Sequence, residues 1–285
     1  MNHARAGVGK TVAEQRETTG EHVVFDDVSM SFGGRRVFRN LSCAFPQGKI
    51  SVVLGGSGSG KTTILRLIGG LVRPDFGRVI VDGDDVTQMR ERDLYRVRDK
   101  LGMVFQSGAL LDSMTVFDNI AFPLRERRCL LREQIAERVG VRLRSVGLHD
   151  VEGLLPSELS GGMVKRVALA RALIQNPVIV LIDEPFSGLD PVTVKLIEAL
   201  FVKINRETNM TMIMSSHHIP TTMRMAHHVV MLMSDHVIHG SPAELAHSRD
   251  ARVRRFLTEE AEVGDVFERL DQYEVETGLG GHRKP

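Results

Sequence analysis

The sequence predicts an α/β fold built around a parallel sheet, and two observations lead to this prediction. Short apolar runs that are typical of buried strands alternate with longer segments whose apolar residues recur at helical spacing. One of these apolar runs ends in glycines and leads directly into a helical pattern, which is the local order of a phosphate-binding loop. Because alternating strands and helices form crossover units, we expect helices to cover both faces of the sheet.

The composition is that of a globular protein. The chain has 285 residues, of which 42% are hydrophobic and 26% are charged, so it can bury a substantial core. Lys and Arg total 37 and Asp and Glu total 36, and the net charge of +1 gives no general attraction to nucleic acid. The two cysteines are too few for a disulfide framework. With no apolar run of membrane-spanning length and no secretory signal, we expect a cytoplasmic protein.

The N-terminal part of the chain predicts four successive elements. Residues 1–20 are polar and aperiodic, which predicts a disordered tail. Short β-type runs alternate with turns over 22–49 and indicate antiparallel strands. The apolar run 50–54 predicts a buried strand, and the apolar residues within 61–71 follow a helical spacing.

The remainder of the chain continues the alternation of strands and helices. A Ser at 241, a Pro at 242 and a Glu at 244 form the start signal of a helix. Between Glu259 and Glu276 an acidic segment places its apolar residues on one helical face, which predicts an amphipathic helix that packs on its own domain or on a partner. The other predicted elements are buried strands at 101–105, 178–182, 211–215 and 229–233, and helices at about 131–146, 162–175 and 190–206.

A phosphate-binding loop is predicted at residues 55–62, which read Gly-Gly-Ser-Gly-Ser-Gly-Lys-Thr and fit G-x-x-x-x-G-K-[ST]. Backbone amides at the start of the following helix point at phosphate oxygens and carry the positive end of the helix dipole. We expect Lys61 to contact the β- and γ-phosphates and the Thr62 hydroxyl to bind Mg²⁺. The expected nucleotide-binding residues here are Gly55, Gly56, Ser57, Gly58, Ser59, Gly60, Lys61, Thr62 and Thr63.

Two carboxylates follow the predicted strand at 178–182. Asp183 is expected to lie near the metal of the phosphate site, and Glu184 is expected to orient an attacking water. Two acids after a strand are weak evidence alone because turns favour Asp, but paired with the glycine-rich loop they are specific. Since Mg²⁺ takes few protein ligands, Thr62 and a water-mediated Asp183 are a sufficient set.

The segment Leu159-Ser160-Gly161-Gly162-Met163 resembles the LSGGQ signature of ABC ATPases. The other motifs of that family occur in order: Gln106 as the Q-loop, Asp190 at the end of the D-loop, and His217 as the switch histidine. Phe32 precedes Lys61 by the distance at which the family keeps an aromatic residue against adenine. The resemblance implies a P-loop NTPase fold with an antiparallel β subdomain and a helical subdomain that carries the signature.

The resemblance also implies a mechanism for ATP hydrolysis. ABC domains work as head-to-tail pairs, so a chain with one set of motifs is expected to pair with a second copy of itself. Glu184 would act as the general base, His217 would hold the γ-phosphate, and Gln106 would join Thr62 and Asp183 at Mg²⁺. Lys61 completes the expected catalytic set, and the residues expected to complete the nucleotide site are Phe32, Ser160, Gly161, Gly162 and Asp190.

The domain organisation follows from the same resemblance. We expect a disordered tail at 1–20, an ABC ATPase domain at 21–247 and a C-terminal extension at 248–285. The helical subdomain is expected at about 107–175. Met163 stands where the family signature usually has Gln, and this departure removes no phosphate, metal or base group.

Four segments resemble a narrower group, the MlaF-like ATPase subunits of the Mla/Mce phospholipid transporters: 105–126, 156–163, 184–186 and 250–257. This resemblance implies a peripheral subunit on the cytoplasmic face of a bacterial inner membrane that moves phospholipid between inner and outer membranes and so maintains outer-membrane lipid asymmetry. The implied partners are a transmembrane MlaE-like permease, which docks on 106–126, a periplasmic Mce-domain protein and a small cytoplasmic accessory subunit.

Two other functions stay open. An ABC ATPase for another importer of small polar solutes is disfavoured by the matches at 105–126 and 250–257. A non-transport ABC ATPase acting on DNA or ribosomes is disfavoured by the single set of motifs and by the near-neutral charge, and we expect no nucleic acid partner.

Overall fold

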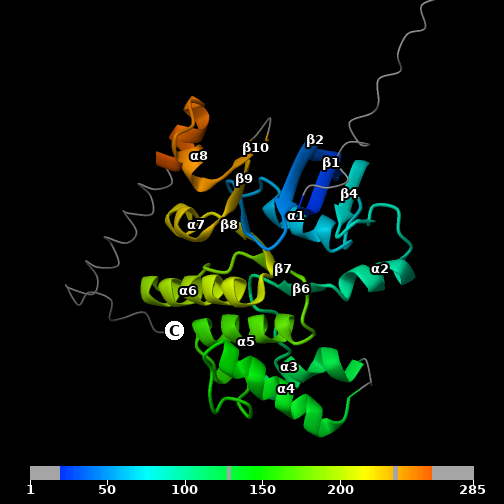
Figure 1. Ribbon diagram of the computed structural model, residues 1–285, viewed down its shortest axis with the longest axis vertical. Coiled ribbons are helices and arrows are strands. Elements are labelled where there is room, and N and C mark those ends of the chain that lie inside the picture. The colour runs from blue at the N-terminus through cyan, green and yellow to red at the C-terminus, as the bar shows by residue number, and fades with distance from the viewer. Residues whose placement is uncertain (1–19, 127–129, 234–236, 259–285) are drawn as a thin grey trace, which may run out of the picture.

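The computed structural model describes residues 20–126, 130–233 and 237–258 (Figure 1). The tail predicted at 1–20, apart from Gly20, and the acidic helix predicted at 259–276 lie outside these residues. No helix within the described ranges has both the length and the apolar character needed to cross a membrane.

An antiparallel sheet forms the N-terminal part of the chain, as the alternation over 22–49 predicts. Its strands follow the order β2-β1-β4-β5, and β1 and β2 form a hairpin whose turn contains Gly33 and Gly34, both at positive φ. The sheet buries one face, with Val23, Phe25 and Phe45 at the centre of its core. The strands are β1 (Glu21–Phe32), β2 (Arg35–Pro46), β4 (Phe76–Val81) and β5 (Asp84–Asp85).

A second sheet of six strands forms the centre of the molecule, in the order β10-β9-β3-β8-β7-β6. Its strands run parallel except β10, which pairs antiparallel with β9. Every residue of β3, β7 and β8 is buried, as expected for parallel strands covered on both faces. The strands are β3 (Ile50–Leu54), β6 (Leu101–Val104), β7 (Ile179–Asp183), β8 (Thr211–Ser216), β9 (His228–Leu232) and β10 (Val237–Gly240).

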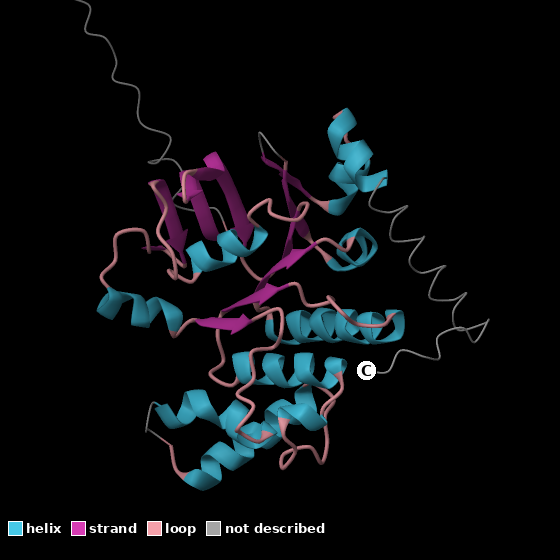
Figure 2. Cartoon of the chain, turned by 180° about the vertical axis from the view of Figure 1, so that it is seen from behind, coloured by secondary structure: helices cyan, strands magenta, loops and turns pink. Residues whose placement is uncertain are grey.

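Helices and the first sheet cover the two faces of this central sheet (Figures 1 and 2). On one face Val53 packs with α1, α2 and the antiparallel sheet, and on the other Val52 and Leu54 pack in a cluster that includes α3 to α8. The helix predicted over 61–71 ends three residues early because Gly69 and Gly70 follow, the latter at positive φ. The labelled helices are α1 (Lys61–Ile68), α2 (Glu91–Arg98), α3 (Val116–Glu126), α4 (Arg132–Ser145), α5 (Gly161–Leu173), α6 (Pro191–Thr208), α7 (Ile219–Met225) and α8 (Pro242–Ala246), and residues 251–258 are helical as well.

A buried histidine joins the two sheets. His22 of β1 lies 2.6 Å through Nδ1 from Oγ1 of Thr211, the first residue of β8, and 3.3 Å through Nε2 from Oδ1 of Asp82. The backbone N–H of Gly48 also donates to this Thr211 oxygen, at 2.8 Å. Lys100 also pairs with Asp82, at 2.8 Å.

This linkage predicts an acid-sensitive fold. Burial lowers the pKa of His22, and the attraction of Asp82 only partly offsets that effect. Because the unfolded chain then binds this proton more readily, the free energy of unfolding should fall as the pH drops below about 6.5. We expect urea unfolding to show lower stability at pH 5.5 than at pH 7.5, and we expect His22→Gln to reduce this difference.

The exposed His149 offers a matched control, because His149→Gln removes an imidazole without touching either sheet. A His22→Gln protein that kept the whole pH difference would show that the interface between the sheets is not the acid-sensitive element.

Candidate active site

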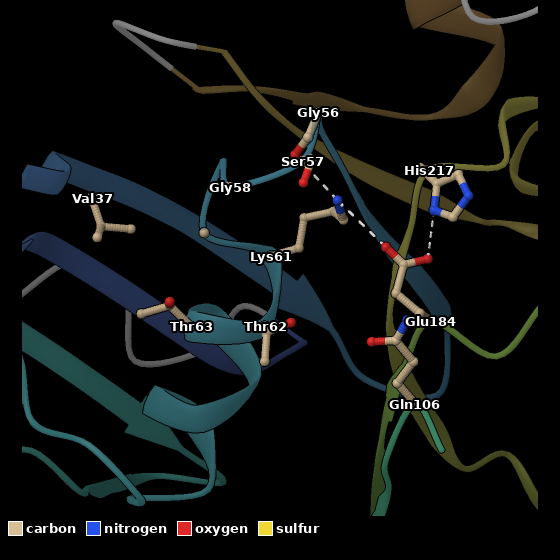
Figure 3. A pocket seen from close by; sticks show the side chains of 11 residues that line it. Val37, Gly56, Ser57, Gly58, Lys61, Thr62, Thr63, Gln106, Glu184 and His217 are labelled. Atoms are coloured by element: carbon tan, nitrogen blue, oxygen red, sulfur yellow. Dashed lines mark hydrogen bonds and ion pairs between the residues drawn. The ribbon is translucent and has the colours of Figure 1, made fainter. Parts of the chain in front are cut away.

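A cavity of about 590 Å³ opens at the carboxyl ends of β3, β7 and β8, where neighbouring parallel strands place their following loops side by side (Figure 3). The loop after β3 supplies most of one wall, and the loops after β6, β7 and β8 supply the other. The lining residues are Val37, Gly56, Ser57, Gly58, Gly60, Lys61, Thr62, Thr63, Gln106, Glu184 and His217. Apart from Val37, all of them were expected from the sequence.

The glycine-rich loop wraps around the start of α1. Gly60 has φ +101°, and a Cβ atom there would lie 2.6 Å from the ring of Phe38, so the turn accepts only glycine. Lys61 begins the helix and its Nζ donates to the carbonyls of Gly55, at 2.8 Å, and Gly56, at 3.2 Å. The amides of the first helical turn therefore face the cavity beside a lysine, which is a suitable site for a phosphate group.

Glu184 is the central carboxylate of the cavity. It follows β7 with φ +45°, an unusual backbone conformation for a residue with a side chain, and its N–H donates to Ser215 Oγ at 2.9 Å. One carboxylate oxygen lies 3.4 Å from Lys61 Nζ and the other lies 2.8 Å from His217 Nδ1, as the dashed lines in Figure 3 show.

The electrostatic surroundings keep Glu184 ionised. Burial opposes its charge, but the hydrogen bond and charge of His217 together with the charge of Lys61 outweigh that effect and lower its pKa. With a side chain only 12% exposed, Glu184 is an anion positioned to accept a proton inside the cavity.

A hydroxyl and a carboxylate meet directly below the glycine-rich loop. Thr62 Oγ1 lies 3.0 and 3.1 Å from the two carboxylate oxygens of Asp183, and Ser215 Oγ donates to one of them at 2.5 Å. Such oxygen donors are those that Mg²⁺ prefers, so the residues present fit the metal. Gln106 lines the same cavity, and its side-chain amide donates to Ser187 Oγ at 3.4 Å.

Several expected site residues lie outside the lining of this cavity. Phe32 is at the end of β1 with 44% of its surface exposed, and Ser59 lines a neighbouring groove between β2 and β9. The signature residue Ser160 caps α5 by accepting the N–H of Met163 at 3.3 Å, and Asp190 caps α6 in the same way. In the single chain the signature is therefore not part of the cavity, and the same holds for Gly161 and Gly162.

Three residues near the site were missed from the sequence. Val37 lines the cavity from β2, Ser215 binds both Asp183 and the Glu184 amide, and Lys165 reaches the backbone of Gln106 and Glu184. Ser215 ends a predicted strand next to β7, a position that could have indicated it, whereas Lys165 carries no such signal.

Comparison with known proteins identifies the chain. Residues 38–187, more than half of its length, match the family model described as ABC transporter. The chain belongs to the ABC transporter family. As an ABC ATPase it binds and hydrolyses ATP, and the fold class and enzymatic activity expected from the motifs are confirmed.

Similar proteins support this assignment over most of the length of the chain. The chain is 44% identical over 232 residues to the intermembrane phospholipid transport system ATP-binding protein MlaF of Escherichia coli K12, covering 81% of this chain and 86% of that protein. It is 39% identical to the probable ribonucleotide transport ATP-binding protein mkl of Mycobacterium bovis, covering 84% of this chain and 67% of the relative. A solved dimer of the ATP-binding cassette MJ0796, in a post-hydrolysis state with ADP and Pi, matches with a TM-score of 0.71, 30% identity, and coverage of 77% and 98%.

Proposed function

We propose that this ABC ATPase drives a transporter that moves phospholipid between the inner and outer membranes of a diderm bacterium and so maintains outer-membrane lipid asymmetry. The observation that carries the proposal is the 44% identity to MlaF across 81% of the chain. In this proposal the chain is a peripheral subunit on the cytoplasmic face of the inner membrane. Its partners are an MlaE-like permease, a periplasmic Mce-domain protein and a small cytoplasmic accessory subunit.

The cavity accounts for hydrolysis by the following assignment. The amides of the glycine-rich loop and Lys61 bind the β- and γ-phosphates, and the adenine stacks on the ring face of Phe32. Glu184 accepts the proton of the attacking water, and His217, hydrogen-bonded to that carboxylate, contacts the γ-phosphate. Thr62, Gln106 and Asp183 would hold Mg²⁺, and the metal would supply positive charge to neutralise the phosphate oxygens.

A second copy of the chain completes the nucleotide site. Ser160 and Gly162 at the start of α5, with Gly161 between them, and Asp190 at the start of α6 lie outside the cavity of their own chain. A head-to-tail partner brings them to the γ-phosphate, where the N-terminus of α5 attracts the anion. The dimeric state of the solved MJ0796 cassette supports this arrangement.

The permease docks on the segment 106–126. Apart from Gln106, this segment lies in the proposed helical subdomain at about 107–175, which is part of an ATPase domain at 21–247. Two large apolar residues of this segment are exposed: Leu111 by 41% and Phe122 by 39%. Exposed apolar side chains of this size on one segment are typical of a protein–protein contact. An apolar end of a permease helix would cover both side chains and transmit its movement to Gln106.

Affinity purification of the tagged chain from its native membranes in mild detergent tests the proposal. We expect an MlaE-like permease, an Mce-domain protein and bound phospholipid to copurify. Phe122→Arg should release the permease while ATP hydrolysis by the isolated chain continues. Phe76→Arg is the matched control, because Phe76 is 74% exposed on β4 and should leave the complex intact.

A second candidate function comes from the likeness to mkl, whose name assigns it to ribonucleotide transport. In that case a permease would copurify without an Mce-domain protein or phospholipid, and the nucleotide-site assignments would stand. Recovery with no membrane partner at all would overturn the transporter proposal.

A further inference from the structure

Lys165 joins two catalytic loops to the helix that carries the signature. It lies one turn into α5 and is 8% exposed. Its Nζ donates to the main-chain carbonyl of Gln106 and, at 3.3 Å, to that of Glu184. Because Gln106 follows β6 and Glu184 follows β7, one ammonium group holds the loops of two paired strands against a single helix.

Because Lys165 is buried, its hydrogen bonds to the two loops should matter more for their positions than a contact on the surface would. Taking an ammonium out of water is costly unless polar partners replace the lost hydration, and here two carbonyl groups do so. Burial lowers the pKa of Lys165, while the charges of Glu184 and Asp183 raise it. Removing the donors would leave the partly buried Gln106 and Glu184 carbonyls without this partner, and the loss of both hydrogen bonds favours a shift of the loops.

A second cation on α5 shows what is particular to Lys165. Arg171 donates to the carbonyls of Gly108 and Ala109, both at 2.8 Å, where the backbone has positive φ. It thus holds the segment after Gln106 on the same helix. Lys165 differs from Arg171 because it also reaches the main-chain carbonyl of Glu184, and so it links that segment to the backbone of the residue proposed as the general base.

We propose that Lys165 is a positioning residue for ATP hydrolysis, one that fixes the backbones of Gln106 and Glu184 relative to each other and to the signature helix. The proposal rests on the role of Glu184 as the general base. The side chain of Lys165 does not touch the nucleotide. Its effect is on the placement of the base, and a movement of the segment 106–126 reaches Glu184 through it.

Steady-state kinetics of the full-length Lys165→Met protein test the proposal, because methionine keeps an unbranched apolar stem and removes the donors. Misplacing a reacting group by about 1 Å costs roughly 10²-fold in rate, so we expect kcat to fall about 10- to 100-fold. The KM for ATP should stay near the wild-type value, since the phosphate-binding loop is untouched. Lys165→Arg, which keeps a cationic donor, should recover part of the lost kcat.

Arg142→Met is the matched control for a general loss of stability. Arg142 is a half-buried cation of α4 whose side-chain hydrogen bond, among the described residues, is to the Asn176 side chain and not to the backbone of Gln106 or Glu184. The expected result is a similar change in Tm for both variants but a loss of kcat only for Lys165→Met.

Two results would overturn the positioning role: a folded Lys165→Met protein with unchanged kcat, or equal losses of kcat in Lys165→Met and Arg142→Met. If Lys165→Met does not fold, Lys165→Gln decides in its place, because its shorter amide should not span both carbonyls and should lower kcat at constant KM. Unchanged hydrolysis by Glu184→Gln would instead overturn the general base and this proposal with it.

Discussion

Replacing Glu184 with glutamine is expected to lower kcat for ATP by about 10²- to 10⁴-fold, the contribution of a positioned general base. The amide has the shape of the carboxylate but cannot accept a proton from water. The structure makes this substitution conservative, because an amide can still lie between Lys61 and His217. The effect should therefore fall on the chemical step, with ATP binding retained and the ATP-bound dimer accumulating.

Phosphate release in a single turnover, together with size-exclusion chromatography in ATP, measures both parts of this expectation. Glu207→Gln is a suitable control, because Glu207 is an exposed residue of α6 whose ion pair within the described part of the chain is with Lys203, four residues away. Hydrolysis near the wild-type rate in Glu184→Gln would assign the base to another group.

Lys61→Met is expected to weaken ATP binding by roughly 30-fold or more, since truncating one partner of a buried charge pair costs about 2–5 kcal/mol. Lys61 is 9% exposed, and its ammonium is held by the carbonyls of Gly55 and Gly56 in the loop that would receive the phosphates. Removing that charge also removes a group that lowers the pKa of Glu184, so the pKa of this carboxyl should rise.

Calorimetric titration with ATP gives the dissociation constant, and the exposed Lys203→Met variant controls for the loss of a surface charge. An unchanged dissociation constant would mean that the phosphates bind elsewhere. A shift of the lower limb of the pH–rate profile to higher pH would confirm the electrostatic link between Lys61 and Glu184.

The elements that local sequence signals specify were predicted well. The strands β6 to β9 lie within one residue of their predicted ends, because buried parallel strands are near-continuous apolar runs. Helix α3 was missed since Pro123 lies inside it, and a proline normally argues against a helix interior. Strand β4 was missed because its first half is exposed and contains Gly77, a residue that weakens a strand pattern and whose close approach to the backbone of Asp27 is visible only in three dimensions.

The same division applies to the active site. The glycine-rich loop and the carboxylates after β7 are contiguous motifs, so their positions follow from the sequence. Lys165 was not predicted because it reaches Gln106 across 59 positions and Glu184 across 19, contacts that only the packing of α5 creates. The expected roles of Ser160 and Asp190 at the nucleotide depend on a second copy of the chain, and their structure here shows helix caps.

The cap at Ser160 has a consequence for how two copies meet. Its hydroxyl oxygen accepts the N–H of Met163, so one of its two lone pairs is used within the chain while the hydroxyl proton stays available to donate. In the proposed dimer a phosphate oxygen, which is an acceptor, would meet a donor whose torsion is already restricted. Because the Ser160 side chain is already ordered before association, each subunit would lose less side-chain entropy when the dimer closes around ATP.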